Sequence, residues 1–109
     1  MAVVEIHPEA QTEVKSLPER ERKAISNAVD KLRELGDALG YPHSSQVQGT
    51  SLRELRPRRG NSPWRAFYQR RGDQFFIVAA IGPEAIRDPR RFRRAVADAQ
   101  DRLADLEVL

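Results

Sequence analysis

Seven consecutive apolar residues, Phe75 to Ile81, constrain the fold of this 109-residue chain more than any other segment. Aromatic and β-branched residues on both faces of a strand predict that it is buried on both sides, in the centre of a sheet. The strand is expected over Gln74–Ile81. Two more strands are predicted at Leu52–Arg56 and Trp64–Arg70, and the short connections between the three favour antiparallel pairing.

Helical periodicity surrounds these strands. A short β-branched strand, Val3–Ile6, is followed by a helix from Pro8, and a second helix is predicted after Ser16, which has capping-box spacing to Glu19. Residues 41–50 lack periodicity and predict a loop. A final helix is expected after Asp88-Pro89, with the apolar stripe Phe92, Ala95, Val96, Ala99, Leu103 and Leu106.

The predicted order is therefore β-α-α-β-β-β-α. It indicates an α+β fold in which a small, mainly antiparallel sheet packs against a helical hairpin and a C-terminal helix. A chain of 109 residues has room for one hydrophobic core, so residues 1–109 are expected to form a single domain.

Several classes of function are disfavoured by what the sequence lacks. There is no cysteine, and the two histidines, His7 and His43, stand 36 positions apart, so we expect no metal centre. Signatures of nucleophilic triads and phosphate-binding loops are absent, and no cofactor is predicted. Neither an apolar run of about 20 residues nor a signal peptide is present, so a cytoplasmic protein without a membrane span is expected.

The positive charge is concentrated in one segment. Residues 52–96 hold twelve arginines and four acids, a net charge of +8, while the whole chain carries only +3. The planar guanidinium group suits phosphates and nucleobases, which favours a polyanionic partner. An arginine-rich proteome of high GC content is the alternative explanation for the residue type.

Strand alternation predicts a candidate site in this segment. If Leu55, Trp64 and Tyr68 pack under the helices, the other face brings together Glu54, Arg56 and Arg65. We expect that face to be open. The alternative is a surface ion pair of Glu54 with Arg65 or Arg56, which would add about 0.2–1 kcal/mol to stability.

A second group of arginines stands at the start of the final helix, where the helix dipole disfavours cations. This placement suggests a bound anion, either RNA phosphate or an acidic protein segment. The alternative is a solvated helix face with pairs such as Arg94 and Asp98. The candidate nucleic-acid contacts across both regions are Arg53, Arg58, Arg59, Arg87, Arg90, Arg91 and Arg94.

His43 is the candidate general acid or base, although a lone loop histidine more often only hydrogen-bonds its surroundings. Tyr41, Trp64 and Tyr68 are candidates for stacking a single-stranded base if they prove exposed. Trp64 and Tyr68 have the alternation of core residues.

The order of these motifs resembles a known family. Leu39-Gly40-Tyr41-Pro42-His43, then Leu52-Arg53-Glu54-Leu55-Arg56, then Trp64-Arg65-Ala66-Phe67-Tyr68 are similar to the phage-derived, HigB-like branch of the RelE/ParE toxin superfamily. The resemblance covers nearly the whole chain. It implies the RelE-like fold and a type II toxin, held inactive by a cognate helix-turn-helix antitoxin, which cleaves mRNA on the ribosome without a metal.

In that reaction the 2′-hydroxyl of the RNA attacks the adjacent phosphate, and cationic side chains stabilise the developing charge. The resemblance implies that Arg65 contacts the scissile phosphate, that Arg56 assists, and that Glu54 is a base or aligns Arg65. The family's Lys-Lys pair and C-terminal Tyr or His have no counterpart at residues 82–89. The alternatives are a ParE-like toxin that acts on a topoisomerase and a catalytically silent module that binds RNA or an antitoxin.

Overall fold

Five strands form one sheet with the spatial order β1-β5-β4-β3-β2 in the computed structural model, which describes residues 1–107. The strands are β1 (Val3–Ile6), β2 (Ser44–Gln46), β3 (Arg53–Leu55), β4 (Trp64–Gly72) and β5 (Phe75–Pro83). Neighbouring strands are antiparallel except for β1 and β5, which run parallel. The predicted α+β class and element order are confirmed, with β2 as an addition.

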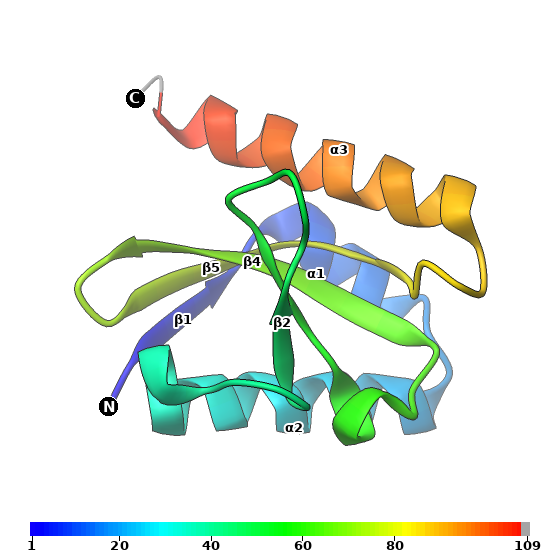
Figure 1. Cartoon of the computed structure of the whole chain (residues 1–109), viewed down its shortest axis with the longest axis horizontal. Coiled ribbons are helices and arrows are strands. Elements are labelled where there is room, and N and C mark those ends of the chain that lie inside the picture. The colour runs from blue at the N-terminus through cyan, green and yellow to red at the C-terminus, as the bar shows by residue number, and fades with distance from the viewer. Residues whose placement is uncertain (108–109) are drawn as a thin grey trace.

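Helices cover both faces of the sheet (Figure 1). They are α1 (Pro8–Lys15), α2 (Glu19–Leu35) and α3 (Pro89–Glu107), with short 3-10 turns η1 (Gly36–Ala38) and η2 (Pro57–Gly60). One core, which includes Ile25 and Val29 of α2, fills the space between α1, α2 and the sheet. A second core lies under α3 and includes Phe67 and Ala99. The central strand β5 is therefore buried on both sides, as its sequence predicts.

Two local predictions are wrong. The segment 41–50 contains the strand β2, which pairs Ser44–Gln46 with Arg53–Leu55 and thereby extends the sheet. The capping box does not form, because α2 begins at Glu19 with Pro18 as its N-cap, while Ser16 ends α1 and its hydroxyl donates to the Thr12 carbonyl. At the other end of the chain the predicted cap is present, since the Asp88 carboxylate accepts from the Arg91 amide.

A single arginine, Arg102, joins α3 to α1 and to strand β5. The Arg102 guanidinium donates to both carboxylate oxygens of Glu13 on α1, at 3.0 and 2.9 Å, and to the Ala79 carbonyl at 2.9 Å. Hydrogen bonding to Glu13 raises the pKa of Arg102 above its ordinary value. Asp98 lies 4.0 Å from Arg102 and, among residues 1–107, does not form the ion pair with Arg94 that the alternative interpretation of the sequence proposes. The sheet face beneath α3 is consequently closed.

Within residues 1–107, no helix combines the length and apolar character needed to cross a membrane.

Candidate functional site

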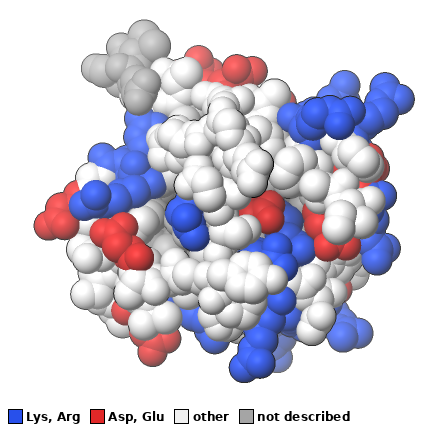
Figure 2. Space-filling view, in the orientation of Figure 1, with Lys and Arg blue, Asp and Glu red and all other residues white. Residues whose placement is uncertain are grey.

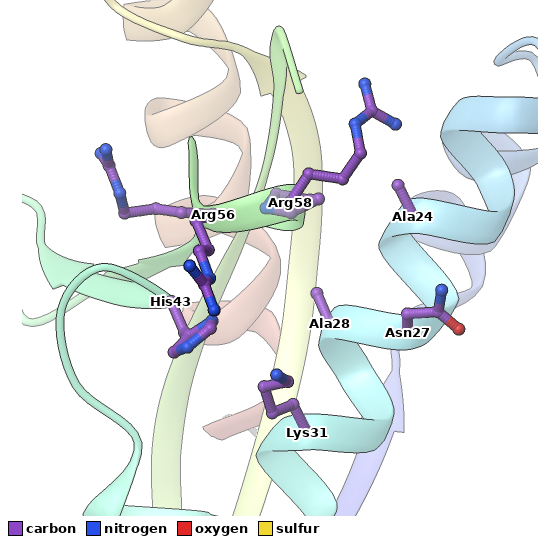
Figure 3. A pocket seen from close by; sticks show the side chains of 9 residues that line it. Ala24, Asn27, Ala28, Lys31, His43, Arg56 and Arg58 are labelled. Atoms are coloured by element: carbon purple, nitrogen blue, oxygen red, sulfur yellow. The ribbon is translucent and has the colours of Figure 1, made fainter. Parts of the chain in front are cut away.

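A basic pocket of about 230 Å³ lies between α2 and η2 (Figure 3). We call it the α2–η2 pocket. The α2 wall is formed by Ala24, Asn27, Ala28 and Lys31, and the opposite wall by His43, Arg56, Pro57, Arg58 and Arg59. Four of the residues singled out from the sequence are thus brought together here. Figure 2 shows basic side chains gathered over this lower part of the molecule and again where α3 begins.

Arg56 is held firmly at the pocket wall. Its Nε donates to the Pro42 carbonyl at 3.1 Å, and its guanidinium lies 5.1 Å from the centre of the Tyr41 ring. A side chain on Gly60 would collide with this guanidinium, since a Cβ there would lie 2.5 Å from Nη2. Glycine at position 60 therefore makes room for Arg56. A cation fixed in this way can meet a phosphate with little further loss of side-chain entropy.

Glu54 lies behind Arg56 and is shared between two arginines. Its carboxylate is 3.6 Å from Nη1 of Arg56 and 3.7 Å from Nε of Arg65, and it accepts a hydrogen bond from the Ser45 hydroxyl at 3.3 Å. Both arginine distances exceed ordinary hydrogen-bond lengths. Glu54 therefore offsets the charge of Arg56 only in part, and much of that charge remains for an anion in the pocket.

Arg65 is buried, so the expectation of an open strand face is wrong. Alternation correctly places Glu54, Arg65 and Phe67 on one face, but α3 covers that face, where Phe92 packs edge-on against Phe67. The Arg65 side chain is only 4% exposed. A phosphate of a bound RNA cannot reach it in this arrangement, and its part in a site is to position other groups.

The contacts of Arg65 organise the segment that leads from η2 into β4. Its guanidinium donates to the carbonyls of Ser62 at 2.7 Å and Trp64 at 2.9 Å, and to the Glu84 carboxylate at 3.0 Å. Burial lowers the pKa of Arg65, an effect that the charges of Glu54 and Glu84 oppose. A further bond of 3.4 Å to the Gly60 carbonyl reaches the end of η2, so Arg65 helps to hold one wall of the pocket.

The backbone of η2 is strained. Arg58 and Arg59 both adopt left-handed angles, with φ of 53° and 59°, and Gly60 follows with φ of 92°. The left-handed region disfavours residues other than glycine, asparagine and aspartate by about 1 kcal/mol or more each. Such strain persists where the surrounding structure imposes it, and it is concentrated at functional sites.

Glu21 on α2 imposes part of this conformation. Its carboxylate accepts from Arg58, the first of the strained residues, at 3.0 Å and from the hydroxyl of Ser62, which follows them, at 2.8 Å. Burial acts to raise the pKa of Glu21, but these two hydrogen bonds and the charges of Arg58 and Arg20 bring it below the ordinary value. Arg58 is thus engaged within the protein. Arg59 is exposed and has no partner within residues 1–107, so its charge is free for a ligand.

We expect Arg59→Asn to raise the free energy of unfolding by about 0.5–1 kcal/mol, because asparagine tolerates the left-handed region better than arginine. The same change should weaken the binding of phosphate or RNA, since it removes an unpaired cation. Urea unfolding and an affinity measurement check the two effects. Arg59→Lys, which keeps both charge and strain, is the control. Equal stability of the Asn and Lys variants would show that the left-handed backbone carries no strain of this size.

His43 lines the pocket opposite Lys31 (Figure 3). Burial lowers the pKa of the His43 imidazole, and the charges of Lys31 and Arg59 lower it further. The imidazole is therefore neutral at pH 7 and able to accept a proton. A neutral base can activate a hydroxyl nucleophile, and neighbouring cations can stabilise the charge that develops when a phosphoryl group is transferred to it.

The remaining predicted contacts lie outside this pocket. Arg53 donates to the Ser44 hydroxyl at 3.0 Å and lines a separate hollow with residues 36–40. Arg87 is 3.6 Å from Glu84. A shallow depression at the start of α3 is lined by Arg90, Arg91, Arg93 and Arg94, the α3 arginine cluster. Sequence and structure thus give two separate basic surfaces, one between α2 and η2 and one at the start of α3.

Two polar residues of the pocket, Asn27 and Lys31, were not singled out from the sequence. They are four positions apart on α2 and therefore lie on one face of the helix. From the sequence, that face is indistinguishable from ordinary solvent-exposed surface, and only the structure shows that η2 packs opposite it. Within residues 1–107, no group of three or more acidic, histidine or cysteine side chains is placed to hold a metal ion.

Comparisons with known proteins agree with this architecture. Residues 12–82 match the family described as "Phage derived protein Gp49-like (DUF891)". The YoeB-YefM complex from Staphylococcus aureus contains a chain that superposes with a TM-score of 0.56 at 16% identity, over 74% of this chain and 94% of that one. A heterotetrameric YoeB-YefM toxin-antitoxin complex from the same organism gives 0.55 at 16% identity, over 73% and 93%. No curated protein matches the sequence.

Proposed function

Because this chain belongs to the phage-derived Gp49-like family and has the fold of the YoeB toxin, we propose that it is the toxin of a type II toxin-antitoxin system. Its activity would be that of a ribosome-dependent endoribonuclease, which cleaves mRNA in the cytoplasm and so inhibits translation. The observation that supports this best is the α2–η2 pocket, where the neutral His43 faces Lys31 and Arg59, two cations without a hydrogen-bond or ion-pair partner among residues 1–107.

The proposed reaction uses the RNA's own nucleophile. His43 takes the proton of a 2′-hydroxyl, and the 2′-oxygen forms a bond to the adjacent phosphorus. The bond from phosphorus to the 5′-oxygen breaks, which leaves a 2′,3′-cyclic phosphate, and the 5′-oxygen takes a proton from solvent, to which the pocket is open. No metal or cofactor enters this scheme. Arg56 and Arg59 stabilise the negative charge that accumulates on the phosphate oxygens.

Glu54 and Arg65 are positioning residues in this proposal. Glu54 orients Arg56 from behind, and Arg65 holds Glu54 and the η2 segment in place. This assignment departs from the direct phosphate contact that family resemblance implies for Arg65, because only 4% of that side chain is exposed.

The α3 arginine cluster supports binding of the RNA backbone, together with Arg53 and Arg87 outside the α2–η2 pocket. Phosphate contacts of this kind position a nucleic acid without reading its sequence. These contacts would position one proposed partner, mRNA on the ribosome. The other proposed partner is a cognate helix-turn-helix antitoxin. A small reading frame for such a protein beside that of this chain would support the pairing.

Induced expression tests the proposal directly. It should arrest growth and yield mRNA cut within translated reading frames, and Arg56→Ala should abolish both effects while it leaves the fold intact. Growth arrest with DNA damage and intact mRNA would instead indicate a ParE-like toxin that acts on a topoisomerase. Stable expression without toxicity would indicate a silent binding module.

The pH dependence of cleavage should report on His43. The base must be neutral, so kcat/KM is expected to rise with pH and to reach half of its maximum below the ordinary imidazole pKa of 6.5, since burial and then Lys31 and Arg59 lower the pKa of His43. Lys31→Gln removes one of these charges and should move the half-maximum to higher pH. Rate profiles on programmed ribosomes measure both. A half-maximum that stays in place or falls in the variant would contradict the role of His43.

A further inference from the structure

One aromatic side chain beside the pocket is left uncovered. Tyr41 is 77% exposed, whereas Tyr68 is 2% exposed and its hydroxyl is engaged with that of Ser44. Trp64 is partly buried against the core, and the guanidinium of Arg91 lies 5.8 Å from its ring centre. An exposed tyrosine ring gains nothing from the core of its own protein, so its position calls for another explanation.

Tyr41 is nevertheless held in a defined orientation. The Arg56 guanidinium packs over one face of the ring, with 5.1 Å between its central carbon and the ring centre. Arg56 is itself fixed by the Pro42 carbonyl, by Glu54 and by the space that Gly60 leaves. One face of the Tyr41 ring therefore rests on a fixed cation, and the ring is available to a flat ligand from the solvent side.

We propose that Tyr41 stacks the nucleobase of a single-stranded RNA nucleotide whose phosphate lies in the α2–η2 pocket. The proposal rests on the function proposed above and adds the residue that holds the base. Arg56 belongs to both parts of the arrangement, because it lines the pocket and also contacts the ring. Its charge thus meets the phosphate while its plane supports the ring on which the base lies.

A stacking platform has a recognisable energetic signature. Every base has a π-face, so such a platform binds single strands with little regard to sequence, and its removal weakens binding by about 5- to 150-fold. The effect depends on the base and not on the phosphates. A ligand without bases should therefore not sense the change.

The test uses a fluorescent six-nucleotide oligoadenylate with 2′-O-methyl groups, which lacks the nucleophile and cannot be cleaved, and an abasic oligomer of the same length. Affinities of both are measured at one salt concentration by anisotropy. Tyr41→Ala should weaken binding of the oligoadenylate at least fivefold, and Tyr41→Phe should stay within twofold of the parent. Neither variant should alter binding of the abasic oligomer. The control is Val3→Ala, an exposed apolar side chain on β1 at the opposite edge of the sheet, which should change nothing.

Three results would overturn the stacking proposal: unchanged affinity in Tyr41→Ala, an equal loss for the abasic oligomer, or a parent protein that does not bind the oligoadenylate. Because the oligomer cannot be cleaved, this measurement is independent of nuclease activity. A parent that binds through Tyr41 but leaves mRNA intact would reject the nuclease and retain the platform. If the parent cleaves mRNA and Tyr41→Ala does not weaken binding of the oligoadenylate, the stacking platform is rejected and the nuclease is retained.

Discussion

Replacement of Arg65 with alanine is expected to lower the free energy of unfolding by about 3–5 kcal/mol, which is the usual effect of removing one partner from a buried ion pair. The variant would leave Glu84 and Glu54 without their buried cation and would remove the hydrogen bonds to the carbonyls of Ser62 and Trp64. Since small domains are stable by only about 5–15 kcal/mol, much of the margin would be lost. Thermal and urea unfolding of the purified variant measure the effect.

Arg87→Ala is the matched control. Arg87 lies near the same Glu84, at 3.6 Å, but its side chain is 66% exposed. Its removal should change the free energy of unfolding by no more than about 0.5 kcal/mol. An Arg65→Ala protein that is as stable as the parent but inactive would contradict the positioning role of Arg65. It would mean that this guanidinium reaches the RNA and acts in the reaction itself.

Replacement of His43 with alanine should lower the rate of mRNA cleavage by about 10²- to 10⁴-fold, the range typical of a lost general base. His43 lies half-buried at the pocket wall, and its backbone carbonyl accepts from the Arg56 amide, a bond that any side chain at position 43 preserves. The fold and the affinity for RNA should therefore remain close to those of the parent. Single-turnover cleavage on programmed ribosomes, with circular dichroism, separates the two properties.

The other histidine supplies the control for this change. His7 caps α1, where its Nδ1 accepts from the Glu9 amide at 3.1 Å, and asparagine can make the same cap. His7→Asn should cleave like the parent. A His43→Ala protein that cleaves at the parental rate would show that another group, Glu54 first among them, takes the proton.

The sequence predicted most of the fold because its elements have strong periodicity. The apolar run in β5 required cover on both faces, and the helix stripes supplied it. The strand β2 was missed because Ser44–Gln46 is short and polar and carries no strand pattern of its own; it forms because β3 offers a free edge. The resemblance to a phage-derived family is confirmed by the Gp49-like match, and the predicted fold is confirmed by its similarity to that of YoeB.

The candidate site was predicted only in part. Alternation correctly put Glu54 and Arg65 on one face, since the period of a strand fixes which side chains share a side. It could not reveal that α3 closes that face, because this depends on the angle at which a helix that begins 24 positions after Arg65, at Pro89, crosses the sheet. The contact between Arg102 and Glu13 holds that helix in place. The site consequently moves from the strand face to the gap between α2 and η2.

From residue type and local periodicity alone, the sequence determined three things. The chain is α+β, its arginines are concentrated in residues 52–96, and a histidine and a tyrosine stand in the segment before them. Tertiary structure alone decided which charges are available. Burial and ion pairing commit Arg65, Arg58 and Arg102 to the fold, whereas Arg59 and Lys31 remain free beside His43. The reason is physical, since whether a cation serves stability or a ligand depends on neighbours that are distant in the chain.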